Sequence, residues 1–182
     1  MIRYKSFWNT VLTTSFIVGV FDLLLATGMQ WAKHGAFPNK MLFYMAGGVL
    51  GLETSMQGGI LVAFVGLLTH FVISFCFTIT VFIIFPLFGF QRLPKRTMFL
   101  FGFIYTPIVG LFMHFVALRL TRLPPPGEFK MDIVGFTLFS VGFSIPIFYN
   151  AWRHHKGIEQ PSADKSGFVT RDQEDFFRET GI

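Results

Sequence analysis

Four ionisable residues stand inside or beside the long apolar runs of this sequence. His70 lies within Gly58–Phe88, a run of about thirty residues that contains no Asp, Glu, Lys or Arg. Asp22 and His114 interrupt two other apolar runs, and Glu53 falls in a glycine-rich segment between the first two. Ionisable groups are costly in hydrocarbon, so those that occur face protein, water or a partner and often mark ion or proton pathways. The four residues are therefore candidates for a polar centre inside a membrane.

Three kinds of chemistry fit Asp22, His70 and His114, and a purely structural role competes with them. In the structural interpretation the side chains hydrogen-bond across helices, at about 0.6 kcal/mol per bond. A carboxylate and an imidazole could instead pass a proton or line a solute pathway near neutral pH. Two imidazoles with one or two carboxylates also suit Zn²⁺ or another divalent ion, although the spacing forms no local ligand motif. Haem held by His70 and His114 is the last alternative.

The composition places this polar centre in a membrane protein. Of the 182 residues, 52% are hydrophobic and only 14% are charged, against about 25% charged in soluble domains. The 26 phenylalanines suit lipid-facing positions, and the net charge of +5 fits loops beside anionic head groups better than nucleic-acid binding. No phosphate-binding loop, dinucleotide-binding turn or nucleophile elbow is present, so the sequence favours a protein without enzymatic activity or cofactor but leaves both open. The single cysteine, Cys76, cannot form an intrachain disulfide.

Four apolar segments exceed the roughly 20 residues that a helix needs to cross a bilayer. The predicted spans are residues 7–31, 59–88, 97–120 and 131–152. Between the first two, residues 40–50 are apolar but too short and glycine-rich for a span, which predicts a short re-entrant or interfacial helix. We therefore predict an all-α polytopic membrane protein. Residues 1–152 would form a four-helix transmembrane bundle, and residues 153–182 a polar, partly disordered cytoplasmic tail.

Charges near the predicted spans indicate the orientation. Arg3 and Lys5 precede the first apolar run, as in a signal peptide, but Asp22 interrupts that run and no small-x-small cleavage site follows it. We expect an uncleaved first span.

Four spans place both termini on one side, and that side carries slightly more Lys and Arg, which predicts cytoplasmic termini. The residues on that side are Arg3, Lys5, Arg92, Lys95, Arg96, Arg153 and Lys156, against Lys33, Lys40, Arg119, Arg122 and Lys130.

Small residues recur on the helix faces that carry the ionisable groups. Gly19 lies one turn before Asp22, and Gly66 lies one turn before His70. In the third span, Gly102, Thr106, Gly110 and His114 follow at four-residue steps. Lipid satisfies large apolar side chains, so small residues mark the faces where membrane helices pack on one another. We expect these glycines to pack against neighbouring helices and the ionisable groups to point into the bundle.

Helix geometry places the candidate residues at comparable depth. At 1.5 Å per residue, His70 and His114 both lie about 27–30 Å from the loop that joins spans two and three. Asp22 lies about 22 Å from the same face of the membrane. Glu53, in the glycine-rich segment, would enter the membrane from the side distant from the termini, opposite the loop that joins spans two and three. We therefore expect Asp22, His70 and His114 to approach one another in the half of the membrane distant from the termini.

The run from Asp22 through GGVLG, QGG and GLLTHF resembles a family of small four-span bacterial inner-membrane proteins of the YagU-like kind. The resemblance covers about residues 18–123 and rests on Asp22, the glycines of the connecting segment and the Gly-x-x-x-His of Gly66 and His70. The phenylalanine-rich composition and the long tail depart from the family. The resemblance implies a location in the bacterial inner membrane. It brings no established reaction, although it would suggest a role in acid tolerance.

The leading hypothesis is a small transport-related or stress-related inner-membrane protein with Asp22, His70, His114 and Glu53 as its polar centre. The competing hypothesis is a structural or assembly subunit of a membrane complex, in which these side chains only pack. A membrane metalloprotein or haem protein comes third, with His70, His114 and Asp22 as candidate metal ligands. The expected partners are the lipid bilayer and a second copy or another membrane subunit, not nucleic acid.

Overall fold

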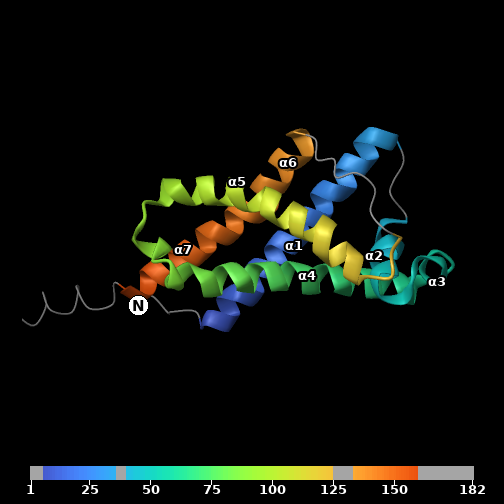
Figure 1. The fold of residues 1–182 in the computed structure, drawn as a ribbon, viewed down its shortest axis with the longest axis horizontal. Coiled ribbons are helices and arrows are strands. Elements are labelled where there is room, and N and C mark those ends of the chain that lie inside the picture. Colours follow the sequence, from blue (N-terminus) through green and yellow to red (C-terminus); the bar gives the residue numbers. More distant parts are fainter. Residues whose placement is uncertain (1–5, 36–39, 125–132, 160–182) are drawn as a thin grey trace, which may run out of the picture.

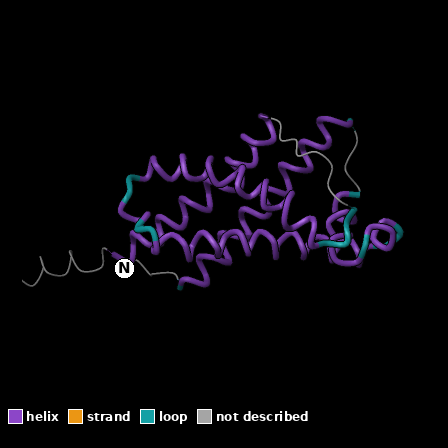
Figure 2. The backbone as a smooth tube through the Cα atoms, in the orientation of Figure 1, coloured by secondary structure: helices purple, strands orange, loops and turns teal. Residues whose placement is uncertain are grey.

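The computed structural model describes residues 6–35, 40–124 and 133–159, and every regular element in them is a helix (Figures 1 and 2). The all-α prediction is confirmed for this part of the chain. Several helices follow one another without a break, because short π or 3₁₀ turns join them end to end. The elements in chain order are α1 (Phe7–His34), α2 (Met41–Leu50), α3 (Leu52–Met56), α4 (Ile60–Leu87), η1 (Phe90–Arg92), α5 (Lys95–Phe112), η2 (Met113–Ala117), η3 (Leu118–Leu120), α6 (Ile133–Phe139), η4 (Ser140–Ser144) and α7 (Ile145–Glu159).

Four helical segments are long and apolar enough to cross a membrane, as predicted. α1 and α4 each supply one, α5 continues through η2 and η3 to form the third, and α6, η4 and α7 form the fourth. The last segment runs farther than expected, since α7 ends at Glu159 and not near residue 152. The first residues of the predicted polar tail are thus helical. The tail from residue 160 onward lies outside the described residues.

The ends of the helices gather at two ends of the molecule (Figure 1). The start of α1, the α4–α5 turn and the end of α7 lie at one end, which we call the terminal end. α2, α3 and the end of η3 lie at the other, which we call the capped end. α2 matches the predicted short helix at residues 40–50. It ends at Gly51, whose φ of 91° is a backbone conformation that favours glycine and turns the chain into α3.

α2 packs directly on α4 at Gly66. A Cβ atom at this position would overlap the backbone carbonyl of Leu42 and lie 3.1 Å from the amide nitrogen of Ala46. Only glycine allows the two backbones to approach so closely. The next turn of the capped end is fastened by a hydrogen bond from the Arg122 amide to the Gly48 carbonyl, with a length of 3.1 Å. α2 therefore closes one end of the bundle.

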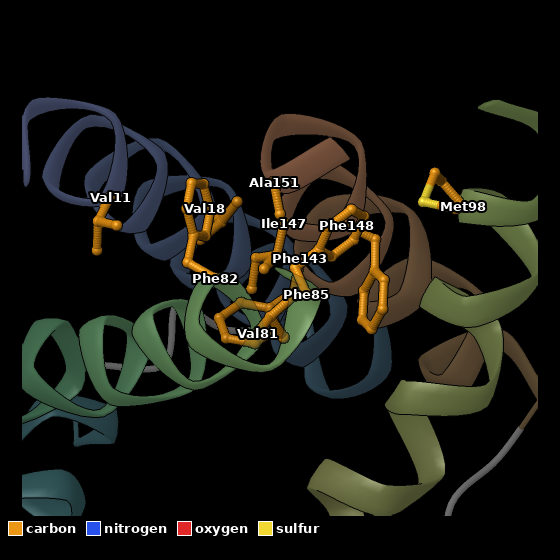
Figure 3. Close-up of a cluster of buried hydrophobic side chains, with 10 residues drawn as sticks. All are labelled: Val11, Val18, Val81, Phe82, Phe85, Met98, Phe143, Ile147, Phe148 and Ala151. Atoms are coloured by element: carbon orange, nitrogen blue, oxygen red, sulfur yellow. The ribbon is translucent and has the colours of Figure 1, made fainter. Parts of the chain in front are cut away.

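The apolar core lies toward the terminal end, where α1, α4 and α7 meet (Figure 3). Its aromatic side chains continue in a chain of ring contacts from Phe85 through Phe148 to Phe101 of α5. This part of the bundle is filled by side chains. The buried residues of the core are Val11, Val18, Val81, Phe82, Phe85, Met98, Phe143, Ile147, Phe148 and Ala151.

The fourth span, through α7, contacts the other three spans. α4 packs on α1, α5 packs on α7 and η4, and α7 also contacts both α1 and α4. Gly102 permits the α5–α7 approach, because a Cβ there would lie 2.8 Å from the Cα of Ile145. Gly110 is half-buried. α4 and α5 are neighbours in sequence, and their backbones stay apart along most of their length. Side chains join them at one place, where Tyr105 Oη donates to the Phe77 carbonyl at 3.2 Å and the Phe77 ring contacts those of Tyr105 and Phe112. The space between them is the feature on which the candidate site depends.

Candidate functional site

A cavity of about 350 Å³ lies between α4 and α5 toward the capped end. Its α4 wall includes Thr69, Ile73 and Phe77, and its α5 wall begins at Val109. α2 contributes to it through Tyr44 and its neighbours. Most of the lining side chains are apolar. Ile73 and Phe77 are half-exposed, and the Phe77 ring contacts those of Tyr105 and Phe112 in α5. Both α4 and α5 therefore border the cavity.

Asp22 and His70 form the polar part of the cavity wall. His70 is buried, and its Nε2 lies 2.9 Å from the backbone carbonyl oxygen of Gly19 in α1. A carbonyl oxygen only accepts hydrogen bonds, so Nε2 carries the proton and donates it. The Asp22 Oδ2 atom lies 4.0 Å from the same Nε2, too far for a hydrogen bond and close enough for an ion pair. The structure thus brings together two of the predicted residues.

The sequence of α1 and α4 explains why this pair forms. Gly66, His70, Ser74 and Thr78 follow at four-residue steps and are all buried, so one face of α4 turns toward the other helices. Gly19 lets α1 approach that face, because a Cβ there would lie 2.9 Å from the Phe71 ring and 3.2 Å from Ser74 Oγ. The close approach places the Gly19 carbonyl within reach of the imidazole. Asp22, one turn further along α1, then lies beside it.

His114 does not join this pair in the structure. It lies on η2, is half-buried, and its ring contacts that of Phe115 at 4.7 Å. Its neighbour Met113 lines the cavity, whereas His114 itself does not. The His114 side chain is therefore not on the predicted face of the helix. An α-helix has 3.6 residues per turn, so three four-residue steps from Gly102 rotate the side chain by about 120° away from the starting face.

Glu53 lies on α3, where its side chain is exposed, and it does not line the cavity. Within the described residues, no three His, Cys, Asp or Glu side chains lie close enough together to hold a metal ion. The candidate ligands Asp22, His70 and His114 therefore do not form a metal-binding group in this arrangement. Of the four predicted polar residues, Asp22 and His70 are the two that lie within 4.0 Å of each other among the described residues.

Two π-helical turns, η2 and η4, border the cavity and were not predicted from the sequence. Met113 and Ala117 of η2 and Phe143 of η4 are lining residues. In these turns the amide of Leu118 bonds the carbonyl of Met113, and that of Ile145 bonds the carbonyl of Ser140, five residues back. Such turns are rare, and they occur frequently at functional sites because they widen the helix and redirect its side chains. The position of Pro146 just after η4 was the available signal.

A buried hydroxyl cluster holds α5 against η4 beside the cavity. Thr106 Oγ1 lies 2.8 Å from Ser140 Oγ and 2.9 Å from Ser144 Oγ, and all three side chains are fully buried. The sequence pattern identified Thr106 as part of a packing face but gave no sign of its two partners. These hydrogen bonds connect helices and leave no free group directed at the cavity, so we assign them to packing.

Comparison of the chain with protein-family models, curated proteins and solved structures found no match.

Proposed function

We propose that this protein is a small transport-related protein of the bacterial inner membrane, which accepts a mostly apolar solute in the cavity and couples its passage to a proton at the Asp22–His70 pair. The observation that carries the proposal is an acid–base pair at ion-pair distance on the wall of an intramembrane cavity. Ionisable pairs inside membranes are costly and typically serve substrate or proton pathways.

The distribution of packing supports a transport role over a closed structural bundle. The terminal end is filled by the core, whereas the cavity lies toward the capped end and is lined by residues of both α4 and α5. A solute site that is closed on one side of the membrane is the arrangement expected of one state of a carrier. Passage would then require α5 to move relative to α4, which would break the hydrogen bond from Tyr105 to the Phe77 carbonyl and the ring contacts of Phe77 with Tyr105 and Phe112.

The orientation with cytoplasmic termini remains part of the proposal. Arg92, Lys95, Arg96 and Arg153 are exposed residues of the terminal end, where positive charge favours the cytoplasmic face. The YagU-like resemblance, with its implied location in the inner membrane, likewise stays a prediction. In this orientation the cavity lies in the outer half of the membrane and its pair would exchange protons with the periplasmic side.

The test uses purified protein in sealed vesicles with a trapped pH-sensitive dye. We expect a pH gradient to drive a proton flux, which the trapped dye reports as a change of internal pH. This proton flux should be lost in Asp22→Asn and His70→Ala, while the folded fraction of both variants stays near that of the parent protein. His154→Ala is the matched control, since that histidine lies near the terminal end against Phe7 and Phe82. If Asp22→Asn and His70→Ala lower thermal stability and the parent protein carries no flux, the structural-subunit hypothesis replaces this one.

The metalloprotein and haem hypotheses have a separate test. Elemental analysis and an absorption spectrum of the purified protein report bound metal and haem directly. A stoichiometric metal or a Soret band would contradict the proposed function, because Asp22 and His70 would then serve as ligands or as neighbours of a prosthetic group.

A further inference from the structure

We infer that the cavity binds a lipophilic cation, specifically an amphiphilic substituted ammonium compound. The inference rests on the proposed function and names the class of solute that the same site would accept. Two independent observations support it: the sign of the charge on the cavity wall and the aromatic rings around it. The size of the cavity then limits the apolar part of the ligand.

The charged groups of the wall favour a cation. Asp22, His70 and Tyr44 are the titratable residues among those that line the cavity, and no Lys or Arg of the described chain is among them. The Asp22 side chain lines the cavity and is 21% exposed. The Nε2–H of His70 already donates to the Gly19 carbonyl. An anionic ligand would be repelled by the Asp22 carboxylate and would find no basic partner beyond the His70 imidazole. An ammonium group would instead form an ion pair with the Asp22 carboxylate.

The aromatic lining supplies a second attraction for a cation. Phe77, Phe139 and Phe143 line the same cavity as Asp22. The rings of Phe139 and Phe143 stack at 4.8 Å, and Phe77 meets Phe143 edge-on at 6.3 Å. Aromatic rings attract cations through the negative potential of their faces, and proteins bind quaternary ammonium groups in this way. A cavity lined by a carboxylate and several aromatic rings is therefore complementary to a substituted ammonium group.

The remaining lining is mostly apolar, with the hydroxyl residues Thr69, Ser74 and Thr121 among it, and the volume suits a ligand of modest length. A cavity of about 350 Å³ falls at the lower end of the range for small-molecule sites, which is about 300–1,000 Å³. We therefore expect a single alkyl chain or a comparable apolar group attached to the ammonium head.

The experiment compares three ligands with the same ten-carbon chain: decyltrimethylammonium, 1-decanol and decanoate. Binding is measured calorimetrically on the protein in lipid nanodiscs, with empty nanodiscs subtracted. We expect the cation to bind at least about tenfold more tightly than decanoate, and Asp22→Asn to remove most of that preference while 1-decanol binding stays unchanged. Phe77→Leu should weaken binding of the cation. Phe77→Tyr, which keeps an aromatic ring, should leave that binding unchanged.

Equal binding of the three ligands, or tighter binding of decanoate, would overturn the inference. Its failure is distinguishable from failure of the proposed function. A proton-driven flux in vesicles together with a preference for decanoate or 1-decanol would leave the transport role standing with another class of solute. Preferential binding of the cation without any flux would support the site and contradict transport.

Discussion

Two histidines in opposite halves of the bundle make the same contact for different reasons. His70 Nε2 lies 2.9 Å from the Gly19 carbonyl, and His155 Nε2 lies 3.0 Å from the Phe82 carbonyl. The Phe82 carbonyl would normally accept the amide hydrogen of residue 86, but that residue is Pro86 and has no such hydrogen. His155 supplies the missing donor. The Gly19 carbonyl already faces the Leu23 amide in the helical pattern, so His70 adds a second donor that the helix does not require.

The two imidazoles also differ in their surroundings: His155 is packed among aromatic rings, and His70 lies beside a carboxylate and a cavity. His155 stacks on Phe85, with ring centroids 5.8 Å apart, at the filled terminal end of the bundle. The neighbouring Trp152 donates from Nε1 to the Leu93 carbonyl at 3.0 Å, which fastens the α4–α5 turn to α7. His70 instead has a carboxylate 4.0 Å away and borders a cavity. A histidine within a membrane helix is therefore no sign of function by itself, and the neighbouring acid and open volume distinguish His70.

The largest expected effect concerns the packing of α2 on α4, which closes the capped end of the bundle. Gly66→Ala would force α2 away from α4, because the added methyl group overlaps the Leu42 carbonyl. We expect a loss of about 3 kcal/mol in the free energy of unfolding, at the upper end of the cost of overpacking a core. Chemical unfolding in detergent micelles measures this. Gly59→Ala is the control, since nothing lies within 4 Å of a Cβ at that position. A similar loss in both variants would contradict the close α2–α4 contact.

The second prediction tests the role of His155 by rescue. His155→Phe keeps a ring on Phe85 but leaves the Phe82 carbonyl without a donor, which we expect to cost about 1–3 kcal/mol in the free energy of unfolding. Adding Pro86→Ala returns an amide hydrogen to that carbonyl and should recover a large part of the loss. A double-mutant cycle on unfolding free energies measures the coupling. Additive effects of the two substitutions would show that His155 does not replace the missing helix hydrogen bond.

The third and smallest effect completes the comparison. His70→Phe removes the matching donor in the other half, but the Gly19 carbonyl retains the Leu23 amide. We therefore expect a change of only about 0.6 kcal/mol, the average for a hydrogen bond between membrane helices. The proton-driven flux should nonetheless disappear. Unfolding and flux measured on the same preparation separate the two roles. A larger loss of stability than in His155→Phe would assign His70 to structure as well.

Local sequence patterns predicted much of this architecture and part of its site. Uninterrupted apolar length sufficed for the four spans, and the glycines around residue 50 indicated the short helix that became α2. The face of α4 with His70 followed from regular spacing. His114 was misplaced because a four-residue repeat drifts around a helix. The π turns and the partners of Thr106 depend on how two helices meet, which no single helix encodes.

The contacts of α2 also determine the order in which the molecule can assemble. α2 leaves the ribosome before α4 and long before Arg122, yet it packs on Gly66 and its Gly48 carbonyl accepts the Arg122 amide. Its binding surface does not exist until the second and third spans have been synthesised. Chains emerge from the N-terminus at about 5–20 residues per second, so α2 must wait several seconds for these partners. The cap of the cavity is thus set in place after most of its walls.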